Sequence, residues 1–136
     1  VQVIRSNRKT IGLEVRADES VILRAPAVDE ISDVEWKSIL GEFTERVNHF
    51  CKVMDVTVGR ITIRNQKTRW GSCSSKGNVN FNYQLYYMPR ELMDYVIIHE
   101  LSHRRHMNHS AEFWQEVEKY CKTYRECRKK LRDYEI

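Results

Sequence analysis

A chain of 136 residues with a net charge of +4 is long enough to bury a core and favours a single domain, 1–136. Hydrophobic residues make up 41% and charged residues 31%, as in soluble globular proteins, and no apolar run approaches the ~20 residues that span a membrane. The charge is too small to indicate nucleic-acid binding by itself. Irregularly spaced cysteines and the lack of a visible signal peptide predict reduced thiols in a cytoplasmic protein.

The first half of the chain is predicted to form strands, one long helix and a further strand. Apolar and polar residues alternate through 1–26, which predicts N-terminal strands. From 29 to 54 the apolar residues recur with a period near 3.6, which predicts a helix that Gly41 weakens without ending. A short strand is expected at 61–64.

The next segment is predicted to be a hairpin. Residues 68–77 are polar and end in turn-forming residues, so the turn is expected near Lys76 and Gly77. Residues 78–85 then alternate strictly, which predicts a half-buried strand with one apolar and one amide-bearing face. The apolar face carries Val79, Phe81, Tyr83 and Leu85, and the other face carries Asn78, Asn80, Asn82 and Gln84.

The last third of the chain is predicted to be helical. Pro89 suits the start of a helix over 90–106, and the run Tyr95–Ile98 is apolar nearly all round, which predicts that this helix is buried. Asn108 interrupts the helix, and Ser110 is a suitable N-cap for the next one. The charged C-terminal tail is expected to form a final helix.

The most informative stretch is His99-Glu100-Leu101-Ser102-His103. Two histidines four residues apart lie on one face of a helix, one turn apart, and can bind one metal ion. Apolar residues immediately precede His99, so the imidazoles are predicted to be buried, and buried polar groups need partners. A metal ion supplies that partner. Glu100 is the predicted general base toward the water that the metal activates.

A third ligand would complete a catalytic zinc site with one open coordination position. His109 is the preferred third ligand, because the chain must turn at Asn108 and can bring this imidazole back over the helix end. Three alternatives remain open, and they are His106, Glu112 and Glu116.

Three blocks, 68–74, 94–103 and 108–114, resemble the YgjP-like, SprT-like group of predicted zinc metallopeptidases. The resemblance extends over about 60–131. Metzincins share the spacing of the three histidines, but they need a glycine where this chain has His106, so the chain is not assigned to them.

The resemblance implies a zincin-like α+β fold. In such a fold the active-site helix packs under a small, mostly antiparallel sheet, with further helices N- and C-terminal to it; helix 29–54 would precede a catalytic core over 60–131. The resemblance also implies Zn²⁺ as cofactor, a catalytic Glu100, and zinc ligands at His99, His103 and His109.

Substrate-binding residues are expected in the hairpin, since an extended peptide can add to a sheet edge above the metal. Trp70 would form the wall of a subsite, Gly71 would allow a close backbone approach, and Asn80 would offer its amide. The alternative for Trp70 is packing in the core. Five basic residues flank the motif blocks and either are solvated or hold an anionic substrate: Arg69, Lys76, Arg90, Arg104 and Arg105.

Together these residues predict a zinc-dependent hydrolase, and a metallopeptidase that acts on peptides or proteins is the preferred hypothesis. One alternative is a metal-dependent hydrolase of nucleotide phosphoanhydrides, a pyrophosphatase. Another is an SprT-like protease associated with nucleic acid. The residues do not determine the bond cleaved, the physiological metal or the oligomeric state.

Overall fold

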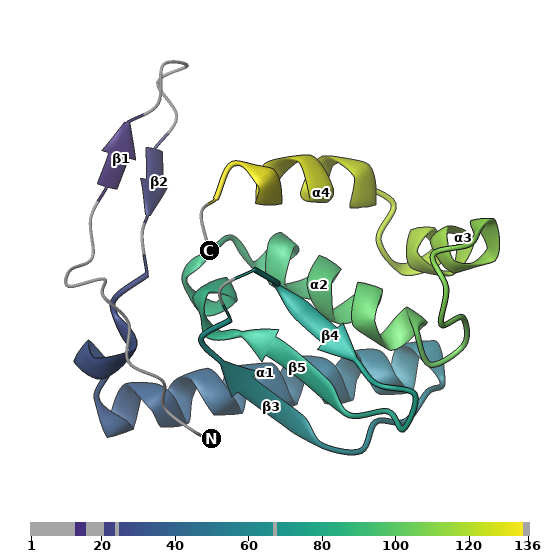
Figure 1. The fold of residues 1–136 in the computed structure, drawn as a ribbon, viewed down its shortest axis with the longest axis horizontal. Coiled ribbons are helices and arrows are strands. Elements are labelled where there is room, and N and C mark those ends of the chain that lie inside the picture. The colour runs from purple at the N-terminus through teal and green to yellow at the C-terminus, as the bar shows by residue number, and fades with distance from the viewer. Residues whose placement is uncertain (1–12, 16–20, 24, 67, 135–136) are drawn as a thin grey trace.

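The structure, a computed structural model, describes residues 13–15, 21–23, 25–66 and 68–134 (Figure 1). Strands β1 and β2 pair antiparallel with each other and stand apart from the other elements. The strand residues predicted before residue 13, and the turn between these two strands, lie outside the described residues. In chain order the elements are β1 (Leu13–Val15), β2 (Val21–Leu23), the 3-10 helix η1 (Val28–Glu30), α1 (Asp33–Met54), β3 (Ile61–Arg64), β4 (Gly71–Cys73), β5 (Val79–Asn82), the 3-10 helix η2 (Tyr83–Tyr87), α2 (Arg90–Ser102), α3 (Ala111–Tyr120) and α4 (Tyr124–Arg132).

The main sheet has three strands in the order β3-β5-β4, so β4 is an edge strand. The predicted hairpin is confirmed: β4 and β5 are antiparallel, and Gly77 takes a positive φ of 86° in the turn between them. Strand β3 is parallel to β5, so the sheet is mixed rather than mostly antiparallel. Because β3 and β4 run in opposite directions, the central strand β5 is parallel to β3 and antiparallel to β4.

One face of this sheet is covered by helices. The register pairs Gly71 with Phe81 and Ser72 with Asn80, so these pairs lie on opposite faces. On the covered face the Phe81 ring stacks on Phe43 of α1, with ring centroids 5.6 Å apart, and Gly71 lies against α2. The α+β fold class predicted from the sequence is confirmed, and α2 lies along β4 (Figure 1).

The long first helix forms as predicted, but it begins at Asp33 rather than at 29. The hydroxyl of Ser32 accepts a hydrogen bond from the backbone N–H of Glu35, which caps the helix there. Gly41 lies inside the helix without ending it. A bidentate ion pair joins Arg46 to Asp94 and so ties α1 to α2.

The strand predicted over 78–85 ends at Asn82 and continues as η2. The Asn82 side chain is fully buried, and its polar atoms have hydrogen-bond partners there. Its amide donates to the carbonyls of Gln66 and Arg69, and its oxygen accepts from the N–H of Gln84. The amide-bearing face is therefore not uniformly exposed. A side chain that satisfies backbone groups in this way closes the loop before β4, and the alternation of polar residues alone did not indicate it.

Helix α2 follows Pro89 and is buried, as predicted, but it ends at Ser102 rather than at 106. The N–H groups of His103 and Arg104 bond back three residues, which tightens the last turn and ends the helix. Ser110 caps α3 as predicted. None of the described helices is long and apolar enough to cross a membrane. The four cysteines are unpaired.

Candidate metal centre

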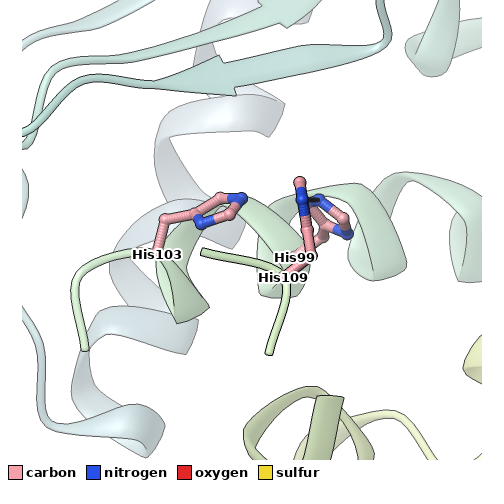
Figure 2. A group of neighbouring side chains, drawn as sticks. All are labelled: His99, His103 and His109. Carbon is pink, nitrogen blue, oxygen red and sulfur yellow. Dashed lines mark hydrogen bonds between the residues drawn. The ribbon is translucent and has the colours of Figure 1, made fainter. Parts of the chain in front are cut away.

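Three imidazoles converge where α2 ends (Figure 2). His99 projects from α2 and His103 from its C-cap, one turn further on, and their ring centroids are 5.3 Å apart. His109 comes from the loop before α3, and its ring centroid lies 4.8 Å from that of His103. One nitrogen of each ring lies within 4.8 Å of the others. The three histidines expected to bind one metal ion are therefore brought together.

Hydrogen bonds orient two of the rings. Nδ1 of His103 lies 3.1 Å from the carbonyl of His106. Because a carbonyl can only accept, this Nδ1 carries the proton and Nε2 is left with its lone pair free. Nδ1 of His99 lies 3.1 Å from the Tyr95 hydroxyl, which can accept from it in the same way. The His106 carbonyl thus fixes the tautomer of His103, as outer partners of metal-binding histidines do, and the Tyr95 hydroxyl orients the ring of His99.

The donor set fits a zinc ion. Tetrahedral coordination with Zn–N distances of about 2.0–2.1 Å places ligand nitrogens about 3.3 Å apart. The Nε2 atoms of His99 and His109 are 3.3 Å apart. At this separation one proton can form a hydrogen bond between the two nitrogens, and a shared cation would take the place of that proton. The residues present therefore suit a metal ion with three protein ligands.

Two aromatic residues at the start of α3 hold the imidazoles in place. The ring of Phe113 stacks on that of His103, with centroids 4.5 Å apart, and it contacts His99 and His109 edge-on. The ring of Trp114 stacks on His109 at 5.9 Å. This packing explains why α3 matters to a site whose first two ligands lie on α2.

Burial favours the neutral form of His99 and His103. It lowers the pKa of His99 from 6.5 to about 3, and the nearby rings of His103 and His109 lower it further. Burial also lowers the pKa of His103. Neutral imidazole is the form that binds metal, so His99 and His103 are already in the protonation state for binding at neutral pH.

Glu100 lies beside the imidazoles and is only 6% exposed. Burial raises the pKa of its carboxyl from 4.5 to about 8, and the charge of Arg69 opposes part of this shift. Within the described part of the chain, no hydrogen bond or ion pair satisfies this carboxylate. A carboxylate whose pKa is close to the working pH is suited to accept and release a proton.

A cavity of about 340 Å³ opens beside His99 and Glu100, and both Trp70 and Gly71 line it. Strand β4 passes so close to α2 that a Cβ at Gly71 would meet Glu100 Cγ at 3.1 Å and Val96 Cγ1 at 3.1 Å. The lack of a side chain at Gly71 thus lets β4 approach α2, whereas the part of Gly71 in substrate binding stays a prediction. Trp70 is half-buried at the cavity wall.

Asn80 does not reach this cavity. It lies on the open face of the sheet, where its amide donates to the Ser72 hydroxyl and it lines a separate polar hollow. The alternative third ligands do not belong to the described group whose ligand atoms lie within 4.8 Å of one another. His106 contributes its carbonyl to His103, Glu116 pairs with Arg105 and Lys119, and Glu112 is exposed in the first turn of α3.

Most basic residues that flank the motifs serve the fold. Arg104 donates to the carbonyls of Thr57 and Ser75, and Arg105 donates to those of Met54 and Asp55. Arg90 forms an ion pair with Glu42 on α1. Of the five basic residues singled out in the sequence, only Arg69 lines the cavity beside Glu100.

Two solved structures share this fold. The metallopeptidase zymogen abylysin of Pyrococcus abyssi matches with a TM-score of 0.60 and 25% identity, covering 65% of this chain and 90% of abylysin. The metallopeptidase zymogen jannalysin of Methanocaldococcus jannaschii matches with a TM-score of 0.59 and 24% identity, covering 67% of this chain and 94% of jannalysin. Fold and site together define a zincin-like metallopeptidase.

The particular family follows from the sequence. Residues 27–134 match the model of the YgjP-like metallopeptidase domain, and the chain therefore belongs to this family. The resemblance inferred from the three motif blocks is confirmed. No protein with a curated description matches the chain. Family membership implies a metal ion and a peptide or protein substrate, and it favours neither the pyrophosphatase nor the nucleic-acid-associated alternative.

Three contributors to the site were missed in the sequence. Tyr95 lies four residues before His99, so the helical period could have indicated their contact. Arg128 and Arg132 of α4 line the cavity, and no local pattern placed α4 there.

Proposed function

We propose that this protein is a zinc-dependent peptidase in which His99, His103 and His109 hold the metal and Glu100 is the general base. The observation that carries the proposal is the convergence of three oriented imidazoles, within 4.8 Å, beside a buried carboxylate. Three histidine ligands leave a fourth coordination position for water or substrate.

The division of labour follows from the chemistry of the groups. Zinc, when bound, polarises the scissile carbonyl and lowers the pKa of a water toward ~7. Glu100 accepts the proton of the attacking water, because burial raises the pKa of its carboxyl to about 8 and the charge of Arg69 offsets only part of that shift. The same carboxyl then donates this proton to the leaving amine.

Strand β4 offers the substrate a backbone to pair with. The carbonyl of Trp70 and the N–H of Ser74 bond to β5. Because N–H and C=O groups alternate in direction along a strand, those of Gly71 and Cys73 point to the open edge. An extended peptide that added to this edge would pass the cavity lined by Trp70, Gly71 and Glu100.

The test is digestion of several unfolded proteins by the zinc-loaded protein, with zinc content measured in the same samples. Glu100→Gln should lower the cleavage rate by about 100-fold or more while the protein keeps its zinc. Glu45→Gln is the matched control, because Glu45 is exposed on α1 and does not line the cavity.

Cleavage that survives in Glu100→Gln, or that persists after removal of the metal by a chelator, would contradict the mechanism. No cleavage of any protein by a zinc-loaded, folded sample would contradict the peptidase assignment.

A further inference from the structure

Three arginines line the cavity beside the metal centre. Arg69 lies just before β4, whereas Arg128 and Arg132 lie one turn apart on the same face of α4. They reach the cavity from its two sides. Among the described residues, Glu100 is the only acidic one that lines it, and the rest of its wall is apolar or aromatic, formed by residues that include Trp70, Tyr95 and Leu131.

These arginines are free to bind a ligand. Within the described part of the chain, none of the three forms an ion pair or donates a side-chain hydrogen bond, although other basic residues do. Arg46, Arg90 and Arg105 pair with carboxylates, and Arg104 donates to backbone carbonyls. Three arginines without such partners therefore line the same cavity.

Their charges act directly on the reacting groups. The charge of Arg69 lowers the pKa of the Glu100 carboxyl, and the charge of Arg128 lowers the pKa of the His99 ring. The guanidinium of Arg128 lies over the Trp114 ring, 4.4 Å from its centroid, and this contact orients it. Trp114 in turn lies between His109 and the ring of Tyr124. A ligand held by Arg128 would thus lie next to the metal centre.

We propose that this cavity is a specificity subsite that binds a carboxylate of the peptide substrate through Arg69, Arg128 and Arg132. A guanidinium binds a carboxylate with two parallel hydrogen bonds, and the apolar wall would hold the aliphatic part of the same residue. The carboxylate can come from an acidic side chain or from a free C-terminus. This inference rests on the proposed peptidase function and adds the class of residue that the enzyme selects.

The experiment first maps the bonds that the zinc-loaded protein cuts in unfolded proteins. Two pairs of synthetic peptides based on a frequent cut site then separate the two sources of carboxylate. One pair has Glu or Gln beside the scissile bond, and the other has a free or an amidated C-terminus. We expect the acidic member of one pair to be cleaved about tenfold faster than its neutral partner.

Variants assign that preference to the cavity. Arg132→Gln and Arg128→Gln should each remove most of it, whereas Arg128→Lys should retain part of it because the charge remains. Lys129→Gln is the matched control, since Lys129 is an exposed base of the same helix that does not line the cavity. Thermal unfolding of each variant establishes that it is folded. If Arg128→Gln is unstable, Arg132→Gln provides the test, because Arg132 is exposed.

A binding measurement separates this inference from the proposed function. The zinc-loaded Glu100→Gln variant is titrated with the labelled peptides, and fluorescence anisotropy reports their affinities. Tighter binding of the acidic peptides that is lost in the Arg132→Gln background supports the subsite even if no peptide is cleaved. Equal affinities and equal cleavage of acidic and neutral peptides, or a preference unchanged in both arginine variants, would overturn it.

Discussion

The proposed metal centre joins two regions that position its histidines in different ways. His99 and His103 project from α2, whose neighbouring side chains Ile97, Ile98 and Leu101 are fully buried, at 0–1% exposure. His109 is exposed and lies in the loop between α2 and α3. The helical ligands are positioned by core packing and the regular spacing of the helix, whereas the loop ligand depends on a few side-chain contacts.

Those contacts anchor both ends of the loop. Arg105 bonds to the carbonyls of Met54 and Asp55 at the C-terminus of α1, where a cation is favoured, and it also pairs with the buried Glu116 of α3. Ser110 caps α3 at the other end of the loop. The loop is therefore fixed by groups far apart in the sequence, and its order is more vulnerable to single changes than that of α2.

The largest effect is expected from removal of the ligands themselves. His103→Ala and His109→Ala should each lower zinc affinity by more than about 100-fold. Loss of a metal ligand weakens binding more than loss of a residue that only hydrogen-bonds to a ligand. The loss should be greater for His103→Ala, because His109→Ala leaves two ligands already arranged by α2. Competition with a zinc-binding dye measures both affinities, with His49→Ala on exposed His49 as control. Equal losses would remove the distinction between helix and loop.

A pH titration of the metal-free protein tests the burial of α2's groups. The raised pKa of Glu100 adds a cost to folding as pH rises from 4.5 to about 8. Glu100→Gln should therefore gain stability relative to the wild type by roughly 3 kcal/mol between pH 5 and pH 8. Urea unfolding at both pH values gives the difference, and a pH-independent difference would show that Glu100 is solvated.

The lowered pKa of His99 acts in the opposite direction. Its contribution to stability is fully present above 6.5 and is lost as pH falls toward 3. The metal-free Glu100→Gln variant, in which the glutamate no longer titrates, should therefore lose stability below pH 6.5. A flat profile would contradict a neutral, buried His99.

Two outer contacts allow the helix and the loop to be weakened separately. Tyr95→Phe removes the hydroxyl beside His99, and Arg105→Gln removes the cationic anchor of the loop. Each should lower zinc affinity by about tenfold, through ring orientation in the first case and loop ordering in the second. Hydrogen exchange separates the causes: Arg105→Gln should speed exchange in 103–110, and Tyr95→Phe should not. Faster exchange of that loop in Tyr95→Phe would refute independent anchoring.

The smallest effect is expected at the second end of the loop. Ser110→Ala removes the side-chain cap of α3 and should destabilise the protein by about 1 kcal/mol. Ser38→Ala, at an exposed position within α1, is the control because no cap is lost there. Denaturant unfolding that showed no difference between the two variants would mean that the cap is dispensable.

Local patterns were sufficient for elements whose physics is local. The four-residue spacing of His99 and His103 is enough to place them on a shared helical face, and Ser110 was identified as a cap from its residue type and position alone. The predicted end of the second long helix, at 106, was wrong. Helix α2 stops at Ser102, and the loop that follows it is held by the carbonyls of Thr57 and Met54.

The sequence by itself determined the chemistry of this protein: two imidazoles and a carboxylate on one buried helix, and a third histidine beyond a helix break. Periodicity and polarity are properties of neighbouring residues, so they can be read from the chain. Only the tertiary structure decided which arginines face the metal centre, because Arg69 and Arg128 are 59 positions apart and meet at one cavity only after β4 and α4 pack on either side of it.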